Sequence, residues 1–197
     1  MGQAQMAKTK YTVSEYLEME AKSEIRHEYY DGEIFAMAGT TMNHNRIVGR
    51  LRNLFERKFL PAGCDVFAEN IKVEAIKNFY YPYPDVIVTC SPEDRAGTYI
   101  VKRPSILVEV LSKSSATYDR GFKLRRYKQI DSLDYYMLVS QNEHYVELYI
   151  RTDQPEIWTY QTFDNERDVI HFEKLDLEIP LSAIYENIVF IPDEETV

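Results

Sequence analysis

Two short apolar segments each carry one acidic residue, and these segments constrain the fold more than any other part of the chain. Asp85 lies near the start of the run 83–90, and Glu109 lies in the middle of the run 105–112. Short runs rich in valine, isoleucine and leucine are typical of buried strands. Because burying an unpaired carboxylate costs several kcal/mol, the two acids predict an ion-pair partner or a metal ion nearby.

The position of Glu109 within its strand predicts that its carboxylate is buried. Successive residues of a strand point to opposite faces, so Glu109 shares one face with Leu107 and Leu111, and the other face is equally apolar. A strand that is apolar on both faces is predicted to be central and covered on both sides. If the strand of Asp85 is its neighbour, the two carboxylates can reach one point at the strand end.

A helix is predicted over residues 119–130, directly after the second apolar strand. At 100° per residue, Asp119, Lys123, Tyr127 and Ile130 fall on one stripe of this helix. Tyr127 and Ile130 are its natural core anchors. Lys123 is therefore expected to project toward the sheet.

An inward-facing Lys123 needs an acidic partner, and the sequence offers three of them. Glu109 and Asp85 are candidates, and Asp119 competes with them from four residues earlier on the same helix. Two carboxylates, a backbone carbonyl such as that of Val110 and waters would complete an oxygen shell typical of Mg²⁺. The simpler alternative is a buried salt-bridge network that fixes the helix on the sheet.

The remaining pattern predicts one α/β domain built on a mixed sheet. The chain has 197 residues, about one domain in length. We expect a disordered segment at 1–10, a single domain at 11–190 and an acidic tail at 191–197. The predicted elements are a short helix at 11–17, a hairpin of 25–30 and 33–38 around Asp31-Gly32, a helix at 44–59, strands at 66–75, 83–90, 105–112, 134–139, 145–150, 157–163 and 169–172, and a helical turn at 181–185.

Charge is distributed unevenly along the chain. The formal net charge is −9, yet residues 44–128 hold 16 basic and 9 acidic side chains, a net of +7. The last third, residues 131–197, holds 3 basic and 16 acidic side chains. The acids and the lysine described above lie in the basic part, which is compatible with a polyanionic partner, although charge blocks also simply solvate a surface.

The cysteine count and the hydropathy of the sequence indicate the cellular compartment in which the protein is expected. Because Cys64 and Cys90 are the chain's two cysteines, a disulfide framework or a cysteine metal site is not expected. No stretch approaches the roughly 20 apolar residues that cross a bilayer, and the N-terminus lacks the apolar core of a signal peptide. We therefore expect a soluble protein in a reducing compartment, the cytoplasm.

A series of short motifs in a fixed order carries a resemblance to a known family. The series is Glu28–Ile34, His44, Pro84–Val88, Val108–Ser112, Asp119–Lys123 and Tyr127. It resembles the Uma-type family of restriction endonucleases, a bacterial branch of the PD-(D/E)XK nuclease superfamily, over about residues 11–186. The resemblance implies a restriction-endonuclease-like fold, with an N-terminal β-hairpin and a mixed sheet flanked by helices. It also implies hydrolysis of phosphodiester bonds, in DNA, with Mg²⁺ or Mn²⁺ as cofactor.

The resemblance assigns roles to five residues. Asp85 and Glu109 match the metal-binding acids, Lys123 matches the catalytic lysine, and Glu33 and His44 match further participants. The superfamily's usual lysine lies two residues after the glutamate, where this chain has Leu111, so the resemblance implies that the lysine has moved to the following helix.

The resemblance also bears on the molecule as a whole. Nucleases of this class often pair two active sites, which makes a homodimer an expectation. The alternative is a catalytically inactive module that keeps the fold for DNA binding or protein interaction, and the acidic last third of the chain favours it somewhat.

Overall fold

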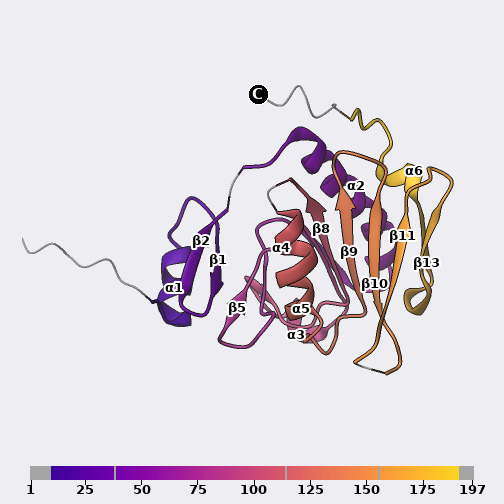
Figure 1. The fold of residues 1–197 in the computed structure, drawn as a ribbon. Coiled ribbons are helices and arrows are strands. Elements are labelled where there is room, and N and C mark those ends of the chain that lie inside the picture. The colour runs from indigo at the N-terminus through magenta and orange to yellow at the C-terminus, as the bar shows by residue number, and fades with distance from the viewer. Residues whose placement is uncertain (1–9, 38, 114, 155, 191–197) are drawn as a thin grey trace, which may run out of the picture.

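A six-stranded mixed sheet forms the centre of the protein in the computed structural model, which describes residues 10–37, 39–113, 115–154 and 156–190 (Figure 1). The predicted disordered segment, apart from Lys10, and the predicted acidic tail lie outside the described residues. In spatial order the strands are β11 (Trp158–Phe163), β10 (Val146–Arg151), β9 (Tyr135–Ser140), β8 (Ile106–Leu111), β6 (Val86–Thr89) and β3 (Asp65–Ala68). Strands β8 and β9 run parallel and the other neighbours antiparallel, which confirms the predicted mixed sheet.

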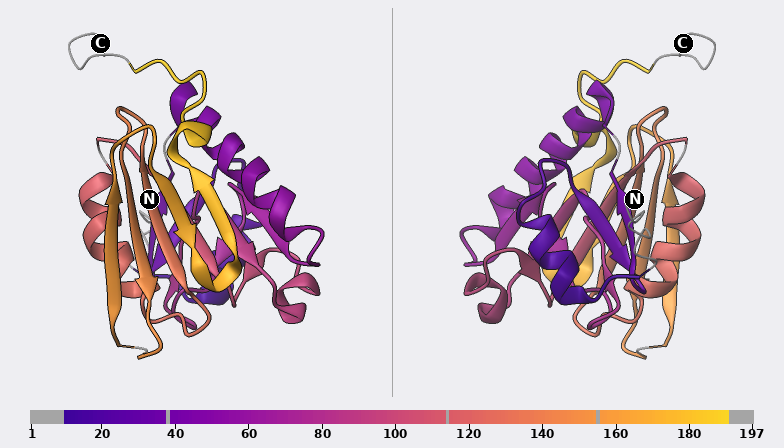
Figure 2. Two further views of the ribbon diagram at one scale, coloured as in Figure 1. Left: turned by 90° about the vertical axis from the view of Figure 1, so that its right-hand side faces the viewer. Right: turned by 90° about the vertical axis from the view of Figure 1, so that its left-hand side faces the viewer.

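The β8 strand is central and covered on both faces, as its composition predicted. All six of its residues are buried. One face is covered by α2 (Met42–Phe59), the hairpin of β12 (Val169–Phe172) and β13 (Leu177–Pro180), and α6 (Leu181–Ile184) (Figure 2). The other face carries α4 (Ala116–Tyr118), the π-helical turn η1 (Asp119–Lys123) and α5 (Leu124–Tyr127). These two layers bury the sheet and hold the side chains that meet at the end of β6 and β8.

A smaller N-terminal unit packs beside this second layer. It consists of α1 (Val13–Glu20) and a three-stranded sheet of β2 (Glu33–Ala36), β1 (His27–Tyr30) and β5 (Tyr80–Tyr81). The predicted Asp31-Gly32 turn is confirmed, since both residues have positive φ angles of 45° and 87°. The ring of Tyr30 lies 4.9 Å from that of Phe122 in η1, so the hairpin contacts the π-helical turn directly.

The predicted strand 66–75 is wrong in its length. Strand β3 ends at Ala68, because Glu69 and Asn70 adopt left-handed φ angles of 52° and 55° that interrupt the ladder. The chain then resumes as β4 (Lys72–Val73), which pairs with β7 (Ile100–Val101). Strand β7, together with α3 (Pro92–Arg95), lies between the predicted strands 83–90 and 105–112, where the sequence predicted no helix or strand.

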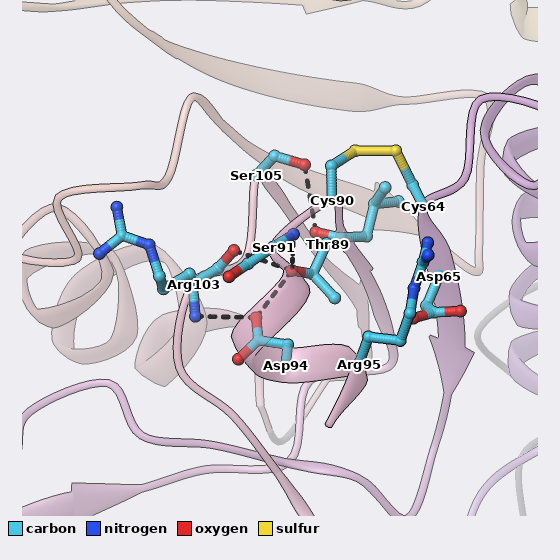
Figure 3. Close-up of a disulfide and its surroundings, with 10 residues drawn as sticks. Cys64, Asp65, Thr89, Cys90, Ser91, Asp94, Arg95, Arg103 and Ser105 are labelled. Carbon is cyan, nitrogen blue, oxygen red and sulfur yellow. Dashed lines mark hydrogen bonds and ion pairs between the residues drawn. A yellow bond between two sulfur atoms is a disulfide. The ribbon is translucent and has the colours of Figure 1, made fainter. Parts of the chain in front are cut away.

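The two cysteines form a disulfide, contrary to the sequence prediction. Cys64 directly precedes β3 and Cys90 directly follows β6, and the antiparallel register pairs Asp65 with Thr89. The register therefore places the two cysteines opposite each other, with Cα atoms 4.1 Å apart. Figure 3 shows the bridge beside Asp65 and Arg95, whose carboxylate and guanidinium lie 3.6 Å apart. A count of two cysteines carries no information on this pairing, which depends on the strand register.

Replacing both Cys64 and Cys90 by alanine is expected to lower the free energy of unfolding by about 3 kcal/mol. The bond closes a loop of sequence separation 26, and losing it returns conformational freedom to the unfolded chain. Urea denaturation of the oxidised wild type should show a higher midpoint than the variant. Dithiothreitol should shift the wild type to the variant's midpoint and leave the variant unchanged; equal midpoints for all samples would contradict a stabilising bridge.

No described helix combines the length and apolar character needed to cross a membrane. The expected cytoplasmic location stays a prediction. It rested partly on the expectation that the cysteines are not bridged, and the disulfide removes that argument.

Candidate active site

Lys123 is held on the inner face of an irregular helical segment. The predicted helix 119–130 begins three residues earlier than expected, at Ala116, and its middle widens into the π-helical turn η1. Asp119 and Lys123, at the two ends of that turn, are 1% and 6% exposed. Tyr127 follows on the same stripe and is fully buried. The predicted inward orientation of the lysine is confirmed.

The ammonium of Lys123 lies among three carboxylates. Its Nζ is 3.0 Å from Oε1 of Glu109, 3.4 Å from Oε1 of Glu28 and 3.4 Å from Oδ1 of Asp119. Burial by itself would lower the pKa of Lys123, but these negative charges outweigh burial and raise the pKa well above 10.5. The side chain is therefore a permanent ammonium at neutral pH.

Glu109 is the buried centre of the cluster. Its Oε1 accepts a hydrogen bond of 2.8 Å from the hydroxyl of Tyr127 in addition to the contact with Lys123. Burial raises the pKa of Glu109 well above 4.5; the Lys123 ammonium opposes this, and the charges of Asp119, Asp85 and Glu28 add to it. The site thus carries more negative charge than Lys123 alone offsets.

Asp85 is fixed beside Glu109 by two hydrogen bonds to β8. Its backbone N–H donates to the carbonyl of Val108 (3.0 Å), and its Oδ2 accepts from the N–H of Val110 (2.7 Å). These bonds flank Glu109 on either side, so the neighbouring strands bring the two predicted metal-binding acids together. Val110 contributes its amide N–H to Asp85, and the metal-binding role expected for its carbonyl stays a prediction.

His44 contacts Asp85 from the opposite layer. Thr41 caps α2, accepting a hydrogen bond from the backbone N–H of His44, and the imidazole Nε2 then lies 3.2 Å from Oδ2 of Asp85. Burial lowers the pKa of His44, but the hydrogen bond and charge of Asp85 outweigh burial and raise it above 6.5. The residue that His44 contacts at the site is therefore Asp85.

Glu33 is not part of this cluster, and Glu28 occupies the place expected for it. Strand β2 is the outer strand of its sheet, so Glu33 is exposed and lies one strand farther from Lys123 than β1. Glu28 shares a face of β1 with Tyr30, whose ring packs on η1, and its Oε1 also accepts from the N–H of Tyr83 (3.3 Å). From the sequence, strand alternation could have placed Glu28 on the same face as Tyr30. That this face lies against η1 becomes clear only from the packing of the hairpin in the structure.

The cluster fits a divalent cation by its charge and its donor atoms. Four carboxylates, those of Glu28, Asp85, Glu109 and Asp119, surround one lysine and one histidine. Oδ1 of Asp85 and Oε2 of Glu109 accept no hydrogen bond from the described residues. In the described part of the chain, no three His, Cys, Asp or Glu side chains form a ready-made metal-binding group. Mg²⁺ commonly takes one or two carboxylates and keeps several waters, which suits a site with two available carboxylate oxygens.

Comparisons with known proteins show the family of the chain. The family profile described as "Uma2: Putative restriction endonuclease" matches residues 13–182, which include every residue of the cluster. The chain belongs to this family. The resemblance inferred from the sequence motifs is therefore confirmed.

Relatives and solved structures extend the similarity over nearly the whole chain. An uncharacterized protein of Synechocystis is 35% identical over 183 residues, which are 92% of this chain and 94% of the relative. A second uncharacterized Synechocystis protein is 32% identical over 140 residues, 70% of this chain and 79% of the relative. The crystal structure of "a putative nuclease belonging to DUF820" from Anabaena variabilis superposes with a TM-score of 0.74 at 16% identity, covering 91% of this chain and 99% of that chain. That similarity establishes the fold of this Uma2 family member.

Proposed function

We propose that this protein is a Mg²⁺- or Mn²⁺-dependent endonuclease that hydrolyses phosphodiester bonds, with DNA as its substrate. The observation that carries the proposal is the buried Lys123 ammonium, which lies 3.0 Å from Glu109. Asp85 is hydrogen-bonded to β8 on either side of Glu109. Two acids from adjacent strands and one ammonium are a minimal set for metal-assisted phosphoryl chemistry.

Each residue of the site has a distinct part in this chemistry. Asp85 and Glu109 would hold the cation, which when bound polarises a phosphoryl oxygen and lowers the pKa of a water. Lys123 supplies positive charge where negative charge develops on the phosphate, and it can orient the attacking water. Glu28 and Asp119 hold the ammonium in place, and His44 holds Asp85.

DNA and a second copy of the chain are the proposed partners. The net charge of +7 over residues 44–128, the part of the chain that holds Asp85, Glu109 and Lys123, favours a polyanionic partner. Cutting both strands of a duplex takes two active sites, and a homodimer would provide them.

The experiment is cleavage of supercoiled plasmid by the purified protein with Mg²⁺, with Mn²⁺ and with a chelator. The wild type should convert supercoiled DNA to nicked or linear forms in the presence of either metal, and the chelator should stop the reaction. Asp85→Asn should remove the activity, because the amide is a weaker metal ligand than the carboxylate. Cleavage that survives the chelator, or that is equal in wild type and Asp85→Asn, would sink the proposal.

One observation favours a second candidate, a non-catalytic module of the nuclease fold. The side chains of Lys123 and Glu109 are only 8% and 5% exposed, so the cluster could act as a polar clamp between helix and sheet. This reading predicts that DNA is bound but never cut with any metal. The plasmid assay, run beside a DNA-binding measurement, separates the two candidates.

A further inference from the structure

The π-helical turn that carries Lys123 needs support from outside the helix. Helices of this type are rare and occur mostly as single turns inside α-helices. In η1 the turn presents Asp119 and Lys123 to the sheet, four residues apart. Contacts between η1 and the sheet must therefore hold this conformation.

One such contact reaches a second buried carboxylate, Glu147 on β10. The strand registers pair Glu109 with Leu138 and Leu138 with Glu147, so the two glutamates lie in one row on the same face of the sheet. Two strand spacings separate them, about 10 Å. The face of the sheet that η1 packs against thus carries two carboxylates, that of Glu109 at the candidate site and that of Glu147 two strands away.

Arg120 links η1 to that second carboxylate. Its Nε lies 2.6 Å from Oε1 of Glu147, which is 3% exposed. The hydroxyls of Tyr160 and Tyr149 donate to the other oxygen of Glu147 at 3.2 and 3.4 Å. A buried carboxylate that is satisfied on both oxygens is a rigid anchor, and none of its partners belongs to the candidate active site.

Consecutive residues of η1 therefore attach to opposite ends of the carboxylate row. Asp119 lies with Lys123 at the Glu109 end, and its carbonyl also accepts a hydrogen bond of 3.2 Å from Tyr136 of β9. Arg120 is bound at the Glu147 end. A turn that is attached at both ends of this row of carboxylates cannot rotate or slide along the sheet without breaking one attachment.

We propose that Glu147 is a positioning residue that, through Arg120, fixes η1 where Lys123 meets Glu109 and Glu28. The expected effect on cleavage rests on the proposed nuclease function. The fixing of η1 by Glu147 does not depend on that function.

The test compares Glu147→Leu, Arg120→Leu and the double variant in the full chain. Arg120→Leu should lower the melting temperature most, because it leaves Glu147 buried without its cation. The double variant removes both charges, and replacing a whole ion pair by apolar residues is often neutral, so its melting temperature should return toward that of the wild type. If Glu147 serves stability alone, the cleavage activity of the double variant should return toward that of the wild type together with its melting temperature.

Positioning predicts instead that the double variant stays impaired. Its kcat on plasmid should remain about 10- to 100-fold below wild type, as for the loss of other groups that orient an active site, with KM little changed. The matched control is Arg50→Leu with Glu186→Leu, which removes an ion pair of 2.8 Å between α2 and the segment after α6. That control should leave kcat unchanged, and a kcat that merely follows melting temperature across all variants would overturn the proposal.

Hydrogen exchange supplies a readout that does not need activity. In the double variant, the amides of residues 119–124 should exchange faster than in wild type while those in the middle of α2 keep their rates. Unchanged exchange in 119–124 overturns the positioning role even if the wild type cuts DNA. Faster exchange in a protein that cuts no nucleic acid supports the positioning role and refutes the proposed function.

Discussion

Replacing Lys123 by methionine is expected to abolish cleavage and to destabilise the fold at the same time. Methionine keeps the length and apolar body of the side chain but removes the charge that three buried or nearly buried acids share. Breaking a buried ion pair from one side typically costs about 3–5 kcal/mol of folding free energy. Removing a group that stabilises the charge developing on the phosphate should slow cleavage by about 10²- to 10³-fold.

Urea denaturation and plasmid cleavage measure the two effects separately. The matched control is Arg125→Met, two residues farther along the same helical segment, where the side chain is exposed. It removes the same charge and should change neither the unfolding free energy nor the cleavage rate appreciably. If Lys123→Met behaved like Arg125→Met in both assays, the lysine would have no special role in the cluster.

Glu28→Gln is expected to reduce cleavage by about 10- to 100-fold, whereas Glu33→Gln should leave it unchanged. Both acids lie on the N-terminal hairpin, five positions apart, and the substitution is the same. Glu28 contacts Lys123 at 3.4 Å and the N–H of Tyr83 at 3.3 Å, so losing its charge frees the ammonium from one of its three restraints. Glu33 is exposed on the outer strand and touches none of these groups.

Initial rates on the same plasmid preparation, with melting temperatures as a check on folding, compare the two variants. The reverse ranking, with Glu33→Gln the more impaired, would restore the role that the family resemblance assigned to Glu33. It would also mean that the hairpin approaches the substrate in a way that the structure does not display.

The part of the site that lies in β6, β8 and the following helix was predictable because its signals are local. Alternation placed Glu109 in a doubly covered strand, and helical spacing placed Lys123 on the inner stripe. The spacing argument succeeded although η1 is π-helical, because Asp119 and Lys123 flank a single widened turn, and Tyr127 still lands on the core side. The widening itself has no sequence signature, since it depends on contacts with the sheet.

What could not be predicted depends on contacts between distant segments. The role of Glu28 requires knowing that the hairpin packs on η1 through Tyr30 and Phe122, more than ninety residues apart in the sequence. The disulfide requires the register of β3 against β6. The end of β3 at Ala68 carries only one weak signal, an asparagine that tolerates a left-handed φ angle.

The Cys64–Cys90 bond gives the protein a covalent ring with Asp85 on its circumference. Glu109 and Lys123 lie outside that ring, on the chain that leaves it after Cys90. A protease that cuts the backbone once between residues 65 and 89 therefore opens the ring without separating the two fragments. Whichever side of Asp85 is cut, the fragment that carries it stays tethered through sulfur to the rest of the molecule, until a reductant releases it.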